Sequence, residues 1–117
     1  MNLKKIFISI IVVFILIISF FTIYIHYEKE RKQQFLTSTL AEKSDVKRET
    51  YDITSSSYTY FGYVYELEFK DEPNIEYAFY VKDTKSDSYS VLYYSYKNNS
   101  NNNPKRDNLF KNTINGE

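Results

Sequence analysis

The stretch Ile6–Ile25, IFISIIVVFILIISFFTIYI, runs for twenty residues without a charge, a glycine or a proline. An α-helix rises about 1.5 Å per residue, so this stretch is about 30 Å long, which matches the hydrocarbon thickness of a bilayer. The rest of the chain has no other apolar run of this length. The sequence therefore predicts a single-pass membrane protein with its anchor at residues 6–25.

Two other interpretations of this stretch are weaker. The apolar region of a cleaved signal peptide is about 7 to 15 residues long and ends in a small-x-small cleavage site, whereas Ser19–Ile23 offers no such site. A buried helix of a soluble protein would have a polar face, but only Ser9, Ser19 and Thr22 interrupt the apolar residues. An uncleaved anchor fits best.

The basic residues on either side of a membrane anchor are the usual guide to its orientation. Lys4 and Lys5 precede it, and Lys29, Arg31 and Lys32 follow it, so basic residues occur in similar numbers on both sides. A tail as short as residues 1–5 favours the cytoplasm, and we expect the C-terminal domain to be extracellular. His26 is the only histidine, and its position at the end of the span favours anchoring at the membrane interface over proton transfer.

The composition beyond the anchor limits the chemistry. This part carries thirteen basic and fifteen acidic residues, a net charge of −2, so it has no basic surface for nucleic acid. The chain has no cysteine, which excludes disulfides and thiolate metal sites. No glycine-rich phosphate loop, Gly-x-Ser-x-Gly motif or histidine cluster is present. We expect no enzyme activity, no catalytic, metal or cofactor-binding residue, and no cofactor.

Carboxylate pairs are the remaining candidates for a site. Asp71 with Glu72, and Asp83 with Asp87, lie in predicted turns and offer too few oxygen ligands for calcium, so we interpret them as solvated. Glu66 and Glu68 lie on one strand face, and a hydrolase would need a concave pocket around them.

Residues 26–45 predict a juxtamembrane helix that continues the anchor, because they are rich in helix formers and lack glycine and proline. Its narrow apolar face, with Phe35, Leu36 and Leu40, suits docking on a sheet.

Residues 46–97 predict an antiparallel meander of three to four strands, because apolar residues alternate along several short segments. The expected strands are Arg48–Thr54, Tyr58–Phe69, Ile75–Lys82 and Tyr89–Tyr94, with loops at Ser55–Ser57, Lys70–Asn74 and Asp83–Ser88. Phe61, Tyr63, Tyr65, Leu67 and Phe69 share one face, as do Ile75, Tyr77, Phe79 and Val81. The fold class is α+β.

Residues 98–117 form an Asn-rich linker and tail. Pro104 suits the first position of a helix with Asn103 as its cap. Leu109, Phe110, Thr113 and Ile114 share one side of such a helix, which either packs on the sheet or frays.

Eleven of the thirteen tyrosines lie between Tyr51 and Tyr96. Tyrosine favours strands, and cross-strand aromatic pairs stabilise a small sheet, so packing explains most of them. A ligand or cell-wall surface would have to use the opposite face, which carries Tyr60, Tyr80 and Tyr94.

The stretch Val64–Tyr80, together with Lys4, Lys5 and the helix end Leu40–Lys43, resembles the domain of unknown function 3139 family of small single-span proteins of Gram-positive bacteria. The matching residues are concentrated in Val64–Tyr80, where the specific feature is the turn Phe69–Pro73, followed by Tyr77 and Tyr80. The likeness extends over about Lys4–Lys82. The resemblance implies a helix and an antiparallel sheet, and it implies no activity.

The sequence therefore favours an uncharacterised, membrane-anchored envelope protein that presents a small non-catalytic domain outside the cell for contact with a protein or the cell wall. Its expected partners are the lipid bilayer and another membrane or cell-wall component. The alternative is a small immunity or regulatory protein that acts on a membrane partner through its span, with Ser9, Ser19 and Thr22 facing another helix.

Overall fold

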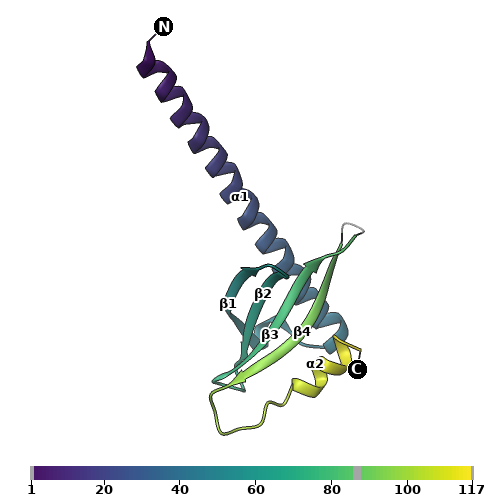
Figure 1. Cartoon of the computed structure of the whole chain (residues 1–117). Helices are drawn as coiled ribbons and strands as arrows, with labels where there is room; N and C mark the ends of the chain where they lie inside the picture. The colour runs from purple at the N-terminus through teal and green to yellow at the C-terminus, as the bar shows by residue number, and fades with distance from the viewer. Residues whose placement is uncertain (1, 86–87, 117) are drawn as a thin grey trace. The chain divides into compact units, whose positions relative to one another are not determined.

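The computed structural model describes residues 2–85 and 88–116. It divides into two compact units, Met1–Arg31 and Lys32–Glu117. Both share the long helix α1, and the second unit also contains a short 3₁₀ turn, a four-stranded sheet and a second helix (Figure 1). The bounds are α1 Leu3–Ser44, η1 Arg48–Thr50, β1 Tyr51–Thr59, β2 Gly62–Phe69, β3 Ile75–Asp83, β4 Tyr89–Asn98 and α2 Asp107–Thr113.

The first unit is the apolar part of α1. Its side chains from Ile6 to Ile25 are exposed on all sides, as expected of a helix that faces lipid rather than a protein core. Among the described residues, α1 is the one helix with the length and composition to cross a membrane. The predicted anchor is thus a continuous helix, consistent with a single-pass membrane protein.

In the second unit, the strands form an antiparallel meander in the order β1-β2-β3-β4 (Figure 1). In β2 and β3, every second side chain is buried, so one face of the sheet is buried. This confirms the residues predicted to share the inward face, with the exception of Phe61. Bulges interrupt the register at Thr54 in β1 and at Tyr94 in β4. The sheet has one buried face, as half-buried strands with a period of two require.

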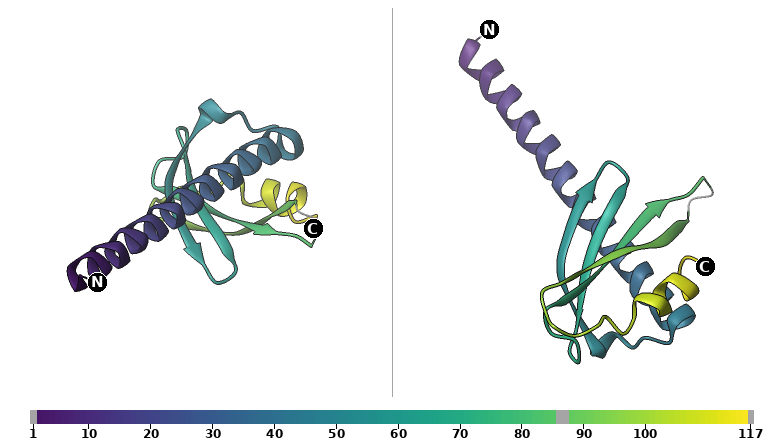
Figure 2. Two further views of the ribbon diagram at one scale, coloured as in Figure 1. Left: turned by 90° about the horizontal axis from the view of Figure 1, so that it is seen from above. Right: turned by 60° about the horizontal axis from the view of Figure 1, so that its bottom comes forward.

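The buried face packs against both helices. Leu36 and Leu40 of α1 are fully buried in one core with the inward side chains of the sheet and Phe110 of α2, and Phe35 packs at its edge. The Ser44 and Thr113 hydroxyls are 2.6 Å apart, so α2 lies beside the end of α1 (Figure 2). The predicted docking of the juxtamembrane helix on the sheet is confirmed. Segments 32–44 and 98–116 belong to the same unit as the strands.

The predicted first hairpin is wrong in its boundaries. Ser55, Ser56 and Ser57 are not a loop but pair with Glu66, Tyr65 and Val64 in β2. Arg48–Thr50 form a 3₁₀ turn rather than part of a strand. The stretch Tyr58–Phe69 is two strands, with a reversal at Tyr60 and Phe61, so Phe61 is 65% exposed.

Gly62 explains why the chain reverses at this point. Its φ is +130°, and a Cβ atom there would lie 2.7 Å from the Val81 carbonyl oxygen. Only glycine accepts both the positive φ and the close approach. The Thr59 hydroxyl donates to the Gly62 carbonyl at 2.8 Å and accepts from the Phe61 amide at 3.3 Å, which closes the turn.

The predicted start of the C-terminal helix is also wrong. α2 begins at Asp107, not at Pro104, and the backbone amides of Lys105 and Arg106 before it donate to the Glu72 carboxylate and the Tyr77 hydroxyl. Of the two outcomes left open for the tail, packing on the sheet is correct, since Phe110 is fully buried.

Candidate interaction surface

The outward face of the sheet is the candidate interaction surface, and we call it the open face. It is formed by the side chains of β2, β3 and β4 that alternate with the buried ones. Its members are partly or fully exposed: Val64, Glu66, Glu68, Glu76, Ala78, Tyr80, Leu92, Tyr94 and Lys97. Because these side chains stand on paired strands, their relative positions are set by the register.

One part of the open face is apolar. Val64, Tyr80 and Leu92 are direct neighbours across three strands. The Tyr94 ring meets the Tyr80 ring edge-on at 5.4 Å, and Tyr94 is 64% exposed. The bulge at Tyr94 brings these two rings together although they are not paired in the register. The predicted binding-side tyrosines Tyr80 and Tyr94 therefore meet, whereas Tyr60 lies in the β1–β2 turn.

The neighbouring part of the open face is acidic. Glu68 pairs with Glu76 across β2 and β3, and Glu76 pairs with Lys97 across β3 and β4. Lys97 Nζ lies 3.8 Å from Glu66 Oε1. The pKa of Glu76 is raised, first because its carboxyl shares a hydrogen bond with Glu66, and further by partial burial. The open face thus combines aromatic and carboxylate side chains.

A second cluster of polar side chains fixes the turn between β2 and β3. The sequence did not predict this cluster. Glu72 was predicted to be solvated but is only 4% exposed. Its carboxylate accepts hydrogen bonds from the Tyr77 hydroxyl at 2.8 Å, the Lys105 amide at 2.9 Å and the Arg106 guanidinium. The partners lie five and more than thirty residues away, so no local pattern could have indicated the burial of Glu72.

Arg106 connects this cluster to the rest of the turn. Its guanidinium stacks over the Phe69 ring at 3.9 Å and donates to Asp71 Oδ1 at 2.9 Å. This hydrogen bond from Arg106 lowers the pKa of Asp71. The carboxylates of the turn are therefore paired to an arginine, which connects the β2–β3 turn to the segment before α2.

Burial and hydrogen bonds also raise the pKa of the inward tyrosines. Desolvation is the main cause for Tyr65, Tyr77 and Tyr93, and Tyr93 gains a second cause because its hydroxyl donates to Asp107 Oδ1 at 2.7 Å. The Tyr51 hydroxyl is buried and has no hydrogen-bond partner among the described residues. These phenols pack the core, as expected for most of the tyrosines.

Of the remaining residues considered from the sequence, Asp83 and His26 belong neither to the open face nor to the Glu72 cluster. Asp83 accepts from Lys32 Nζ at 3.3 Å, while Asp87 lies outside the described residues. His26 lies 3.2 Å from Glu30 on the exposed surface of α1. Within the described ranges, no group of three or more His, Cys, Asp or Glu side chains is arranged to hold a metal ion.

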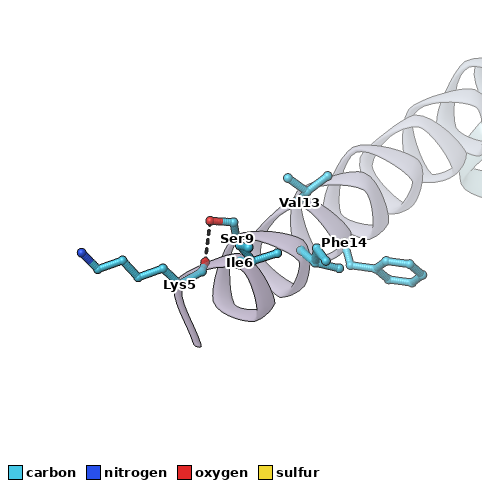
Figure 3. Close-up of a pocket in the computed structure, with 6 residues that line it drawn as sticks. Lys5, Ile6, Ser9, Val13 and Phe14 are labelled. Atoms are coloured by element: carbon cyan, nitrogen blue, oxygen red, sulfur yellow. Dashed lines mark hydrogen bonds between the residues drawn. The ribbon is translucent and has the colours of Figure 1, made fainter. Parts of the chain in front are cut away.

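Shallow depressions occur along α1 and beside Ser44–Thr50. Figure 3 shows the one near the start of α1, lined by Lys5, Ile6, Ser9, Val13 and Phe14. The Ser9 hydroxyl donates to the Lys5 carbonyl at 2.8 Å, and Ser19 and Thr22 bond their own helix in the same way. Glu66 and Glu68 do not line these depressions.

The sequence model of a family described as "Protein of unknown function (DUF3139)" matches residues 1–79. The match covers the apolar helix, the docking part of α1, β1, β2 and β3 as far as Phe79. Neither the comparison with curated proteins nor the comparison with solved structures gave a match.

Proposed function

The chain belongs to the DUF3139 family of proteins of unknown function, and from this premise we propose that it is a non-catalytic envelope protein whose open face contacts a protein or a cell-wall component. The apolar helix anchors it, and the domain beyond it carries the contact surface. On this proposal the domain lies outside the cell and Lys4 and Lys5 lie inside.

The observation that carries this proposal is the difference between the two faces of the sheet. The inward face is covered by α1 and α2, while the outward face leaves Leu92 41% and Tyr94 64% exposed beside a group of carboxylates. Aromatic and apolar side chains held on a rigid sheet bind at low entropic cost, because they lose little freedom on contact. The adjacent carboxylates favour a partner that brings cationic groups.

The absence of catalytic activity is likewise a proposal. The most buried carboxylate of the described residues, that of Glu72, already accepts from three donors. The carboxylates of the open face are partly exposed, so water reaches them. Glu72 is thus occupied by its hydrogen-bond donors, and the open face does not exclude water, so neither group favours acid–base catalysis by carboxylates.

The test uses a photo-crosslinking amino acid in the full-length chain, expressed in its own membrane. Replacing Tyr94 should produce a specific adduct with an envelope component, because this side chain protrudes from the open face. The matched control replaces Asn112, which is exposed on α2 and away from the open face. Equal adduct yields at the two positions would contradict the proposal.

Topology is tested separately on cells stripped of their wall. Externally added protease should remove the part after Tyr27 and leave Lys4 and Lys5 protected. Full protection of the domain would reverse the orientation.

Exchange of the span for an unrelated apolar helix separates this proposal from action through the span. Contact by the open face should survive the exchange, whereas an immunity or regulatory effect that depends on Ser9, Ser19 and Thr22 would disappear.

A further inference from the structure

The end of β1 and the turn that follows it carry three exposed aromatic side chains, which we call the hairpin tip: Tyr58, Tyr60 and Phe61. They are 73%, 94% and 65% exposed. The Tyr60 and Phe61 rings meet edge-on at 5.4 Å, and Tyr58 packs against the edge of Tyr63 at 5.2 Å. A group of exposed aromatic side chains at one end of a small domain is typical of a contact surface.

The hairpin tip lies at the end of the domain where α1 enters. Lys32, the first residue of the second unit, has its Nζ 4.7 Å from the Tyr63 ring and 3.3 Å from Asp83 Oδ2. Tyr63 pairs with Tyr58 in β1 and with Val81 in β3. The β1–β2 turn and the end of β3 therefore lie beside Lys32, and the Glu72 cluster lies at the opposite end of the same strands.

Chain length keeps this end close to the membrane. Lys32 follows Ile25, the last residue of the apolar stretch, by seven positions. Even a fully extended chain spans at most about 3.6 Å per residue, so Lys32 stays within about 25 Å of the end of the anchor. This bound holds for every arrangement of the two units. Lys32, and with it the end of the domain that carries the hairpin tip, is therefore tethered near the bilayer surface.

The chemistry of the hairpin tip suits that surface. Tyrosine has an apolar ring and a polar tip, which favours the headgroup region, and Phe61 adds a purely apolar ring. The Lys82 side chain runs beside Gly62, and its Cγ lies 3.4 Å from the position that a Cβ added to Gly62 would take. Lys85 is exposed between β3 and β4. These two cations match anionic phospholipid headgroups.

We propose that the hairpin tip inserts into the headgroup layer of the bilayer that holds the anchor. This second contact orients the domain, since a single helix leaves it free to tilt and rotate. This proposal requires that the apolar helix spans the bilayer, and it does not depend on any partner of the open face.

The chain contains no tryptophan, so a single tryptophan reports on one position. The full-length Phe61→Trp variant is reconstituted in vesicles of phosphatidylcholine and phosphatidylglycerol, with and without bromine atoms on the upper acyl chain. The matched control is Tyr94→Trp, since Tyr94 is 64% exposed and stands on the open face further from the tip. Flotation with the vesicles establishes that the span is inserted in both.

We expect the Phe61→Trp emission to be blue-shifted and to lose more intensity in brominated vesicles than that of Tyr94→Trp. Acrylamide in the aqueous phase should quench Tyr94→Trp more strongly. If Phe61→Trp disturbs the fold, as judged by its melting temperature, Tyr60→Trp replaces it, because that ring is the most exposed of the three. Bromine quenching no stronger than in the control, in vesicles that carry the inserted chain, would overturn the proposal.

Discussion

At the scale of single residues, Glu72 and Arg106 show how a buried charge is accommodated. A carboxylate that loses its water pays a large desolvation cost unless hydrogen bonds replace the water. The side chain of Glu72 is 2% exposed, and donors from β3 and from the segment before α2 replace its water. The cluster therefore links the β2–β3 turn to the C-terminal segment, which lies beyond the part matched by the family.

Replacing Arg106 tests this link. Arg106→Ala should lower the free energy of unfolding by about 3 kcal/mol, because it leaves the buried Glu72 carboxylate without its charged partner. Urea unfolding of the detergent-solubilised chain, followed by near-ultraviolet circular dichroism, measures the change. Lys105→Ala is the control, since it removes the same charge from an exposed side chain whose residue contacts Glu72 through its backbone only. Equal losses for the two variants would show that the buried pair contributes nothing specific.

The buried tyrosines predict the behaviour of the domain at high pH. Burial raises the pKa of Tyr65, Tyr77 and Tyr93 above the usual value near 10, so the folded state retains protons that the unfolded state releases. Their contribution to stability is complete below pH 10 and is lost as the pH rises above it. In an absorbance titration, Tyr65, Tyr77 and Tyr93 should ionise only above pH 10 and together with unfolding. A single transition near pH 10 with the fold intact would contradict the assigned burial.

At the scale of elements, the β1–β2 hairpin depends on one glycine. The strands pair from Tyr51↔Phe69 to Thr59↔Gly62, and the reversal between them uses only Tyr60 and Phe61. Gly62 allows β2 to start close to the end of β3, because it has no side chain to meet the Val81 carbonyl. The hairpin tip is presented at the Lys32 end of the sheet as a result.

Gly62→Ala should destabilise the domain by about 2 kcal/mol, through backbone strain at a positive φ and the clash with the Val81 carbonyl. Thermal melting of the solubilised chain measures the loss. Gly116→Ala is a matched control, because Gly116 also has a positive φ of +72° but no atom within 4 Å of an added Cβ. The clash has no role if the two substitutions lower the melting temperature equally.

At the scale of the whole molecule, the two units have different requirements. In the part of the chain that the structure describes, the buried hydrophobic residues of the core lie between Leu36 and Phe110, within the second unit. The first unit exposes its apolar side chains and needs a bilayer or detergent. Folding of the domain and anchoring of the chain should therefore be separable.

A chain lacking Met1–Tyr27 should be soluble and retain the near-ultraviolet circular dichroism of the full protein, because it keeps Leu36, Leu40 and every strand. The full chain should resist carbonate extraction from membranes at its complete mass. A truncated chain that stays in the membrane fraction, or one that loses its tertiary signal, would contradict this separation. A mature form that begins after residue 20 would instead identify a cleaved signal.

The sequence alone determined the features that depend on neighbours in the chain. The apolar run Ile6–Ile25 has the length of a bilayer, and the continuous helix formers after it carry α1 to Ser44. Alternation in β2 and β3 indicated the buried face, because successive strand side chains point to opposite sides. The turn Lys70–Asn74 was recognisable because Pro73 and Asn74 favour reversal, and Asn74 has a φ of +68°.

The tertiary structure alone decided the features that depend on distant partners. Ser55–Ser57 form a strand because β2 supplies their hydrogen bonds, although their composition is typical of a loop. Glu72 is buried because Arg106 and Lys105 reach it from a segment more than thirty residues away. The same contacts hold the segment that precedes α2, whose Phe110 lies in the core. In each case the free energy of a long-range contact outweighs a local preference that is worth about 1 kcal/mol or less.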